Sequence, residues 1–280
     1  MGKVGRRTLA GGAALLPAAG LIGAARAETP AESALDRIRR TKTLRIAALP
    51  GELPYFQKNL ATGAWGGAAI EMADSIAKLL GAKLDYVEAT YGTSVLDLQS
   101  DKVDLAFALN PTPERALAVR FAHPMLIHPF GCLARPGLAP KTWADIDKPE
   151  IRIAFDIGSL HETVAKRFAP KAQHVGFPNR DQALLALQSG RADVDVLAAL
   201  LGLSAVAKNP ALGRWYLLGQ PTVALPSSLA VQYEPDTRFV DVLNAWLDFN
   251  RGIGQLREWI IGGLELEGVK REQIPSELTF

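Results

Sequence analysis

An arginine near the start of a predicted helix is the residue whose position points most directly to chemistry. The apolar run Val103–Ala108 predicts a buried strand, and the residues after it predict a short helix. Thr112 suits the N-cap of that helix, Pro113 suits its first position, and Glu114 interacts favourably with the positive end of the helix dipole. Arg115 lies in the same turn, where a cation is unfavourable unless an anion is close. Backbone N–H groups and a guanidinium together suit a carboxylate, although a solvated surface arginine explains the motif equally well.

A second loop of the same kind follows another predicted strand. Ile151–Phe155 predicts a strand, and Gly158 then opens a helix in which Ser159 and Glu162 form a capping box. Ligands of parallel sheets bind beyond the carboxyl ends of the strands, and the loops at Asn110 and Gly158 both lie there. These two loops are therefore the predicted ligand site.

The two loops belong to alternating strand and helix patterns, which favour parallel sheets covered by helices. The first series has strand patterns at Leu44–Leu49, Leu84–Glu88 and Val103–Ala108, and helical patterns at Ala69–Leu80 and Val95–Leu98. After Arg135–Pro140, a second series has strand patterns at Ile151–Phe155, Val175–Phe177, Val194–Leu197 and Trp215–Leu218, and a helical pattern at Ala183–Gly190. Helical patterns at Arg238–Phe249 and Gln255–Ile261 close the chain. Two similar α/β units in a chain of this size predict two lobes with a cleft between them.

The N-terminal residues have the pattern of an export signal. Lys3, Arg6 and Arg7 form a basic start, Thr8–Ala25 is uncharged and rich in Ala, Gly and Leu, and a small-x-small sequence ends at Ala27. We predict a signal peptide over residues 1–27 and a periplasmic mature protein. The adjacent arginines favour twin-arginine export, and Sec export stays open because the flanking residues match only partly.

Charge and cysteine content exclude several classes of function. Residues 1–27 hold four basic residues and no acidic one, so the remaining chain has 27 basic and 29 acidic residues and a formal net charge of −2. It has no basic run, which argues against nucleic acid as a partner. Cys132, the single cysteine, lies in an apolar run and predicts a buried structural thiol. We expect no metal site and no cofactor.

The order and spacing of these motifs resemble those of the type II periplasmic solute-binding proteins of amino-acid ABC transporters, from about Leu44 to Gly263. The segments that carry the resemblance are Leu44–Ile46, Pro54–Phe56, Gly67–Leu80, Leu98–Asp104, Thr112–Arg115, Phe121–Pro124, Gly158–Ser159 and Leu187–Asp193. The resemblance implies two lobes, each a mostly parallel sheet flanked by helices, joined by a two-strand hinge. Lobe 1 would comprise residues 41–131 plus 229–280, lobe 2 residues 138–219, and the hinge crossings residues 132–137 and 221–228.

The resemblance also implies roles for individual residues. Arg115 matches the arginine that pairs with the ligand α-carboxylate, and Asn110 falls where the family offers hydrogen bonds to the ligand. Ser159 matches a position that closes over the same carboxylate. Phe56, in the first loop, is expected to contact the ligand.

The ammonium half of the family's site is not retained. Ala198 stands where the family usually has the aspartate that binds the ligand α-ammonium, and Leu53 stands where an aromatic often stacks on the ligand. A buried ammonium needs a counter-charge, so either another acid substitutes or the ligand has no α-ammonium. Asp156 is the first candidate substitute, ahead of Asp195 and Glu52, although an exposed loop carboxylate is an equally good interpretation of Asp156.

His161 lies on the same predicted helix as Ser159. On a solvated face of that helix it would have no role in binding. Facing the cleft, it would donate a hydrogen bond to a second carboxylate or titrate near neutral pH.

Three functions follow from this comparison. The first, which we favour, is a non-enzymatic monomeric receptor that captures a small carboxylate-bearing solute, an amino acid or derivative, by hinge closure and delivers it to an ABC permease. The second is an enzyme on the same fold, similar to cyclohexadienyl (arogenate) dehydratases, with His161, Asp156 or Glu52 as the acid–base group. The third is an orphan binding protein that serves a membrane sensor.

Overall fold

In a computed structural model, which describes residue 2 and residues 32–280, two groups of parallel strands share one mixed sheet. The strand order is β4-β1-β5-β11-β6-β9-β7-β8, with β10 paired to β6. We call β4, β1 and β5 the first half-sheet and β9, β7 and β8 the second half-sheet, because the strands within each group are parallel. The predicted α/β class, with mostly parallel sheets flanked by helices, is confirmed. The predicted export segment lies outside the described residues, apart from residue 2.

The strands are β1 Thr43–Ala48, β2 Gln57–Lys58, β3 Trp65–Gly66, β4 Lys83–Glu88, β5 Leu105–Leu109, β6 Val119–Ala134, β7 Arg152–Asp156, β8 Gln173–Phe177, β9 Val194–Ala198, β10 Arg214–Leu217 and β11 Ala224–Gln232. The helices are α1 Ala34–Thr41, α2 Ala68–Leu80, α3 Tyr91–Gln99, α4 Pro113–Ala116, α5 Trp143–Ile146, α6 Leu160–Phe168, α7 Arg180–Gln188, α8 Ala199–Lys208, α9 Arg238–Gly252 and α10 Gln255–Leu266. Short 3₁₀ turns cover Pro210–Leu212 and Arg271–Gln273.

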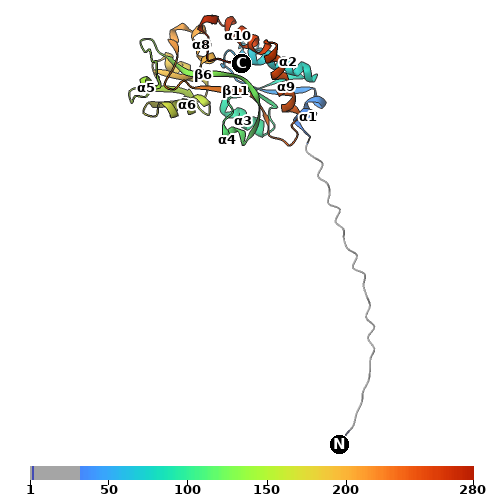
Figure 1. The fold of residues 1–280 in the computed structure, drawn as a ribbon. Coiled ribbons are helices and arrows are strands. Elements are labelled where there is room, and N and C mark those ends of the chain that lie inside the picture. The colour runs from blue at the N-terminus through green and yellow to red at the C-terminus, as the bar shows by residue number, and fades with distance from the viewer. Residues whose placement is uncertain (1, 3–31) are drawn as a thin grey trace. The chain divides into compact units, whose positions relative to one another are not determined.

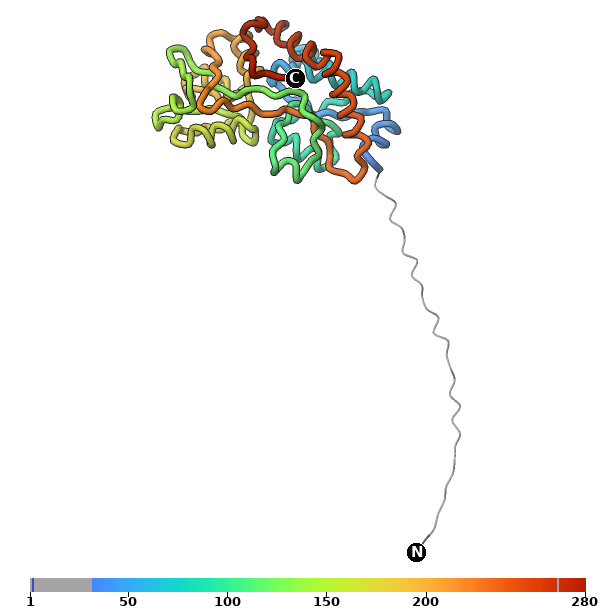
Figure 2. The backbone as a smooth tube through the Cα atoms, viewed as in Figure 1, coloured from blue at the N-terminus to red at the C-terminus, as the bar shows by residue number. Residues whose placement is uncertain are grey.

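One long strand connects the two half-sheets. The first part of β6, as far as Pro129, pairs antiparallel with β11, and from Phe130 onward β6 pairs with β9. The chain returns toward the first half-sheet in the segment between the end of β10 at Leu217 and the start of β11 at Ala224. Figures 1 and 2 show β6 and β11 side by side in the middle of the sheet, between the two groups of parallel strands. Any relative movement of the half-sheets must therefore pass through these segments.

Both half-sheets are held together by the same local device. Asp104, just before β5, accepts hydrogen bonds from the backbone N–H of Arg45 at 2.7 Å and from its side-chain Nε at 3.2 Å. Asp193, just before β9, accepts the equivalent bonds from Arg152 at 3.0 and 2.9 Å. Each aspartate satisfies a backbone donor of the neighbouring parallel strand and so aligns two strands of its half-sheet.

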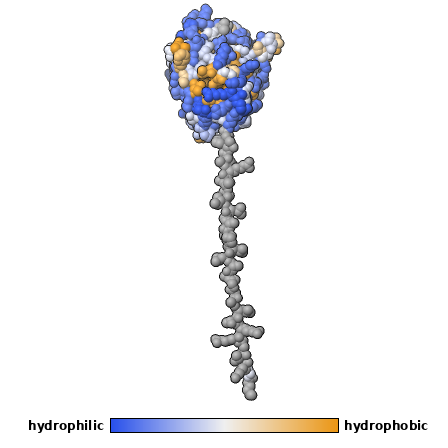
Figure 3. Space-filling model, turned by 90° about the vertical axis from the view of Figure 1, so that its right-hand side faces the viewer, coloured by the Kyte–Doolittle hydropathy of each residue, from blue (hydrophilic) through white to orange (hydrophobic). Residues whose placement is uncertain are grey.

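The helices form because their apolar residues recur on one face. In α2 the predicted spacing is confirmed, with Ile70, Ala73, Ile76 and Leu80 buried. The helix ends at Gly81, whose φ of 63° is the left-handed conformation that favours glycine at a helix end. The face that carries α1, α2 and α9 is mostly hydrophilic on its outside, with a smaller hydrophobic area (Figure 3).

One large buried apolar cluster runs through both half-sheets, and a smaller one lies between β7 and α7. The large cluster includes Ile46 and Leu105 from the first half-sheet, Val194 from the second, and Phe130 and Cys132 from β6. The predicted burial of the Cys132 thiol is confirmed. Within residues 32–280, no helix combines the length and the apolar character needed to cross a membrane.

Candidate functional site

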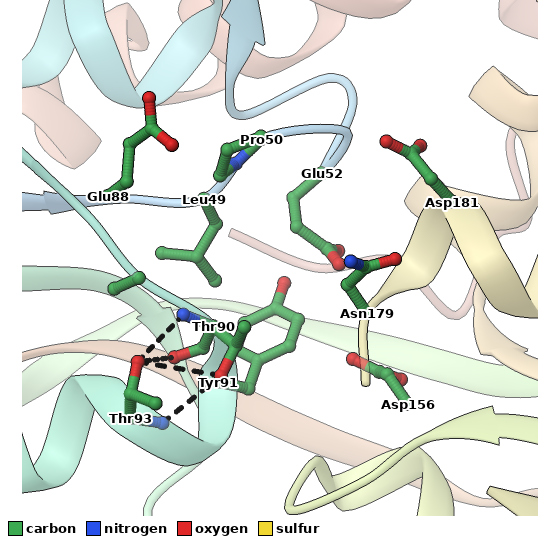
Figure 4. A pocket seen from close by; sticks show the side chains of 11 residues that line it. Leu49, Pro50, Glu52, Glu88, Thr90, Tyr91, Thr93, Asp156, Asn179 and Asp181 are labelled. Carbon is green, nitrogen blue, oxygen red and sulfur yellow. Dashed lines mark hydrogen bonds between the residues drawn. The ribbon is translucent and has the colours of Figure 1, made fainter. Parts of the chain in front are cut away.

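The loops after four parallel strands surround one cavity of about 320 Å³. The loops after β1 and β4 come from the first half-sheet, and those after β7 and β8 come from the second (Figure 4). The cavity is lined by Leu49, Pro50, Glu52, Glu88, Ala89, Thr90, Tyr91, Thr93, Asp156, Asn179 and Asp181. The position agrees with the rule that open α/β sheets bind ligands beyond the carboxyl ends of their strands.

A buried arginine at the start of α7 is the centre of the charge cluster beside this cavity. Asn179 caps the helix by accepting a hydrogen bond from the Gln182 N–H at 3.0 Å, and Arg180 follows as the first helical residue. The Arg180 side chain is 2% exposed and forms an ion pair with Asp156 through Nη2. Its Nη1 donates to both carboxylate oxygens of Asp195 at 3.2 Å.

The first half-sheet contributes a third carboxyl group to Arg180. Glu52, in the loop after β1, places Oε1 3.8 Å from the Arg180 Nε. Figure 4 shows the Glu52 side chain reaching from this loop toward Asn179 and the Tyr91 hydroxyl. Glu52 and Arg180 are therefore in buried contact between the loop after β1 and the start of α7.

The surroundings of these carboxyl groups give them different pKa values. It raises the pKa of Glu52 to about 8 and that of Asp195 to about 7, although Arg180 acts in the opposite direction on both. Burial also acts to raise the pKa of Asp156, but Arg180 and His161 outweigh it and hold that pKa below its usual value. At neutral pH, Asp156 is thus ionised, whereas Glu52 carries a proton in most molecules.

His161 faces the cluster, so the interpretation of a solvated His161 is wrong. Its side chain is buried, and its Nδ1 lies 2.7 Å from Nη2 of Arg180 and 3.1 Å from Oδ1 of Asp156. Burial and the Arg180 charge lower the pKa of His161. In the neutral ring, the tautomer determines whether Nδ1 accepts a hydrogen bond from Arg180 or donates one to Asp156. The interpretation of Asp156 as an exposed loop carboxylate is wrong for the same reason, since both side chains are buried.

Arg115 lies where the two half-sheets approach each other. The predicted N-cap is confirmed, because the Thr112 hydroxyl accepts from the Arg115 N–H at 3.2 Å. The Arg115 guanidinium donates from Nη1 to the Asn110 carbonyl at 3.1 Å and from Nη2 to the Gly158 carbonyl at 2.9 Å. Burial lowers its pKa, and it has no ion pair with a carboxylate of residues 32–280. The Asn110 side chain donates to the Pro226 carbonyl at 2.7 Å.

The loop before α6 touches α3 closely. A side chain at Gly158 would begin 2.9 Å from the Cα of Gly92, and Gly158 has a φ of 78°. The Ser159 hydroxyl caps α6 by accepting from the Glu162 N–H at 3.3 Å and donates to the Asp156 carbonyl at 2.7 Å. The predicted capping box is altered. Its second hydrogen bond, which would join the Ser159 N–H to the Glu162 carboxylate, is replaced by one from the Gly158 N–H to that carboxylate.

Of the residues named for the site in the sequence, Asp156 and Glu52 are among those that line the cavity. Phe56, Ala198 and Leu53 lie away from it. The Phe56 ring is fully buried and packs edge-on against Trp65, with ring centroids 6.5 Å apart. Ala198 is fully buried at the end of β9 and brings no charge to the site. Leu53 lines a separate cavity of about 420 Å³, whose wall also includes Arg180 and Leu184.

Several buried polar atoms near the cluster have no hydrogen-bond partner among residues 32–280. They are Oε2 of Glu52, Nε of Arg180, the hydroxyls of Tyr55, Ser227 and Ser228, and both ring nitrogens of His128. The rings of His128 and His161 both pack on Phe130, at 5.4 and 5.5 Å between centroids. Because unpaired buried polar atoms are costly, this group is suited to contact with a polar ligand or water.

The site therefore combines predicted and unpredicted residues. Asp156 and Ser159 lie with His161 at the cluster, and Arg115 with Asn110 lies at the contact near Gly158. Arg180 and Tyr91 were not predicted from the sequence. No group of three or more metal-ligating side chains is found within residues 32–280.

Comparison with known proteins defines the class of this fold and site. The fold is that of the type II periplasmic binding proteins, and the chain belongs to the bacterial extracellular solute-binding proteins, family 3, whose model matches residues 44–264. It is 26% identical over 238 residues to cyclohexadienyl dehydratase of Pseudomonas aeruginosa, covering 81% of this chain and 84% of that protein. It is 27% identical over 186 residues to a probable histidine-binding protein of Campylobacter jejuni, covering 66% and 71%.

A solved structure agrees with the family assignment. The ancestral amino acid-binding protein AncCDT-1, a precursor of cyclohexadienyl dehydratase, superposes with a TM-score of 0.73 at 27% identity, covering 85% of this chain and 100% of that chain. Binding proteins and an enzyme thus share this fold with the chain.

Proposed function

We propose that the protein is the periplasmic substrate-binding component of an ABC transporter and captures a small carboxylate-bearing solute, an amino acid or derivative. The observation that carries this proposal is the Arg115 guanidinium, which lies between the half-sheets without a carboxylate partner in the described residues. A ligand carboxylate would replace the Asn110 and Gly158 carbonyls as its acceptor. That exchange turns neutral acceptors into a charged one, and charge-assisted hydrogen bonds are about twice as strong.

The proposed binding reaction includes closure of two lobes. Lobe 1 would comprise residues 41–131 plus 229–280, and lobe 2 residues 138–219. A ligand held by Arg115 from one side and by the start of α6 from the other would favour the closed form, because it binds both lobes at once only there.

Removal of Arg115 tests this proposal. The Arg115→Ala variant should keep its unliganded melting temperature but lose the thermal stabilisation that a panel of carboxylic acids gives the wild type, because a ligand that binds only the folded state raises its stability. The exposed Arg214→Ala serves as the matched control and should keep the stabilisation. Undiminished stabilisation of Arg115→Ala would contradict the proposal.

Transport and sensing are separated by a cellular experiment. Deletion of the gene should abolish uptake of the labelled ligand, and the mature monomer, cleaved after Ala27, should be recovered from the periplasm. Unchanged uptake together with a lost transcriptional response to the ligand would favour service to a membrane sensor.

A second candidate function, that of a dehydratase, is favoured by Glu52. Loss of water from a substrate needs a proton on the departing hydroxyl oxygen, and Glu52 lines the cavity while it is largely protonated at neutral pH. Similarity to a cyclohexadienyl dehydratase over most of the chain points the same way. The test is incubation with arogenate while the absorbance of an aromatic product is followed. Turnover that Glu52→Gln abolishes would establish the enzyme, and absence of product would leave the binding function.

A further inference from the structure

The protein carries its own cation at the place where its buried carboxyl groups converge. The three acids that the sequence offers for a ligand ammonium are Asp156, Asp195 and Glu52, and all three point to Arg180. Arg180 is 2% exposed, so water does not screen these contacts. A counter-charge for a ligand ammonium is therefore not free in this cluster.

A second cation beside Arg180 would lack an anion of its own. Asp156 and Asp195 are both paired with Arg180, and Glu52 is mostly protonated at neutral pH. Like charges at close range repel strongly when they are buried. Because Arg115 is a further cation nearby, an anionic ligand would bind more favourably here than a zwitterionic one.

Neutral buried hydrogen-bonding groups lie next to Glu52 and His161. The Tyr55 hydroxyl lies beside Ser227, and His128 faces the same Phe130 ring as His161. Burial lowers the pKa of His128 to about 3, so its ring is neutral. Neither ring nitrogen of His128 has a hydrogen-bond partner among residues 32–280. As neutral groups, the hydroxyls and the imidazole can donate to a carbonyl or hydroxyl oxygen but offer no counter-charge to an ammonium.

We infer that Arg180 takes the place of the ligand's ammonium group, so that the protein binds small carboxylic acids that carry an oxo or hydroxyl group at C2 in place of the α-ammonium. The inference rests on the proposed function, in which Arg115 holds the carboxylate. Two other acids line the cavity, namely Glu88, which forms an ion pair with Lys58, and the exposed Asp181. Asp181 is the remaining position at which an ammonium would find a carboxylate.

Matched ligand series test the inference on the wild-type protein. Calorimetry would compare L-alanine, L-leucine, L-phenylalanine and L-glutamate with the 2-oxo and 2-hydroxy acids of the same carbon skeletons. We expect at least one oxo or hydroxy acid to bind more than about tenfold more tightly than its amino acid. Equal or tighter binding of the amino acids would overturn the inference and leave the proposed receptor intact. Binding of no carboxylic acid at millimolar concentration would contradict both.

Variants of Arg180 provide a second test of the inference. Arg180→Met should remove the preference for oxo and hydroxy acids and raise the affinity for the matching amino acid about tenfold, because Asp156 and Asp195 become free for an ammonium. Since the single change leaves buried carboxylates uncompensated, Arg180→Met with Asp195→Asn keeps a better charge balance and should show the same reversal. The exposed Arg191→Met is the matched control and should bind as the wild type does. An unchanged preference in both Arg180 variants would overturn the inference, as would amino-acid binding that Asp181→Asn abolishes.

Discussion

Among the individual residues, Glu52 and Asp195 have the clearest consequence for pH. Both pKa values lie well above the value near 4 that carboxyl groups have in an unfolded chain, at about 8 and about 7. The folded protein therefore keeps protons that the unfolded chain has lost, and its free energy of unfolding falls as pH rises through this interval. The lowered pKa values of His128 and His161 act in the opposite sense, but only below about pH 6.5.

We predict that the melting temperature falls by several degrees between roughly pH 6.5 and 8.5, at about 2–4 °C for each kcal/mol of stability lost. Glu52→Gln, which imitates the protonated acid, should flatten this slope. Glu88→Gln removes an exposed acid of the same cavity and should retain the slope. Differential scanning fluorimetry over this pH range measures the melting temperatures of the wild type and both variants. If Glu52→Gln kept the wild-type dependence of melting temperature on pH, a group other than Glu52 would be responsible for it.

Part of the site could be predicted from the sequence because its signals are local. The cap at Thr112 and the loop at Gly158 lie next to the residues they position. Arg180 was missed, since its partners come from the loop after β1, the end of β7 and the start of β9. Two signals pointed to it. Asp195 lies inside an apolar strand, where a charge needs a partner, and Arg180 lies in a first helical turn, as Arg115 does.

At the level of elements, the contact between α3 and the loop before α6 depends on two glycines. Gly158→Ala places a Cβ 2.9 Å from the Cα of Gly92, and it also strains a backbone with a φ of 78°. Gly137 has a φ of 87° but open space around it, so Gly137→Ala isolates the backbone strain.

We predict that Gly137→Ala lowers the free energy of unfolding by about 1 kcal/mol and that Gly158→Ala lowers it further, whereas only Gly158→Ala binds the best carboxylic acid of the panel more than about tenfold more weakly. Chemical denaturation measures the first quantity and calorimetry the second. Equal affinities of the two variants would mean that this contact is not needed in the liganded form.

The elements themselves were largely predictable, and the exceptions have a physical reason. Strands β1, β4, β7 and β9 begin and end within about two residues of their predicted bounds, because apolar runs with polar ends define them. The length of β6 was not predicted, since its sequence contains Pro124, Pro129 and Gly131, which normally interrupt a strand. Gly131 is required there because a Cβ would lie 2.0 Å from the Tyr216 carbonyl oxygen of β10.

For the whole molecule, the shared apolar cluster predicts cooperative unfolding. Phe130 and Cys132 of β6 belong to the same cluster as residues of both half-sheets. We therefore expect the amides of β1 and β7 to lose protection from hydrogen exchange at the same denaturant concentration, as in a two-state transition. Mass spectrometry of exchanging peptides measures this, and earlier loss of β7, β8 and β9 would show that the second half-sheet unfolds separately.

The continuity of β6 also limits the insertions and deletions that this strand can accept. Because side chains alternate between faces along a strand, deletion of one residue upstream of Phe130 would turn His128 and its neighbours to the opposite face of the sheet. The same deletion would displace the pairing with β11 against the pairing with β9, so both half-sheets would lose their register together. Homologues are therefore expected to vary in the residue types of β6 while keeping its number of residues, and length differences should collect in loops such as Asn59–Ala64.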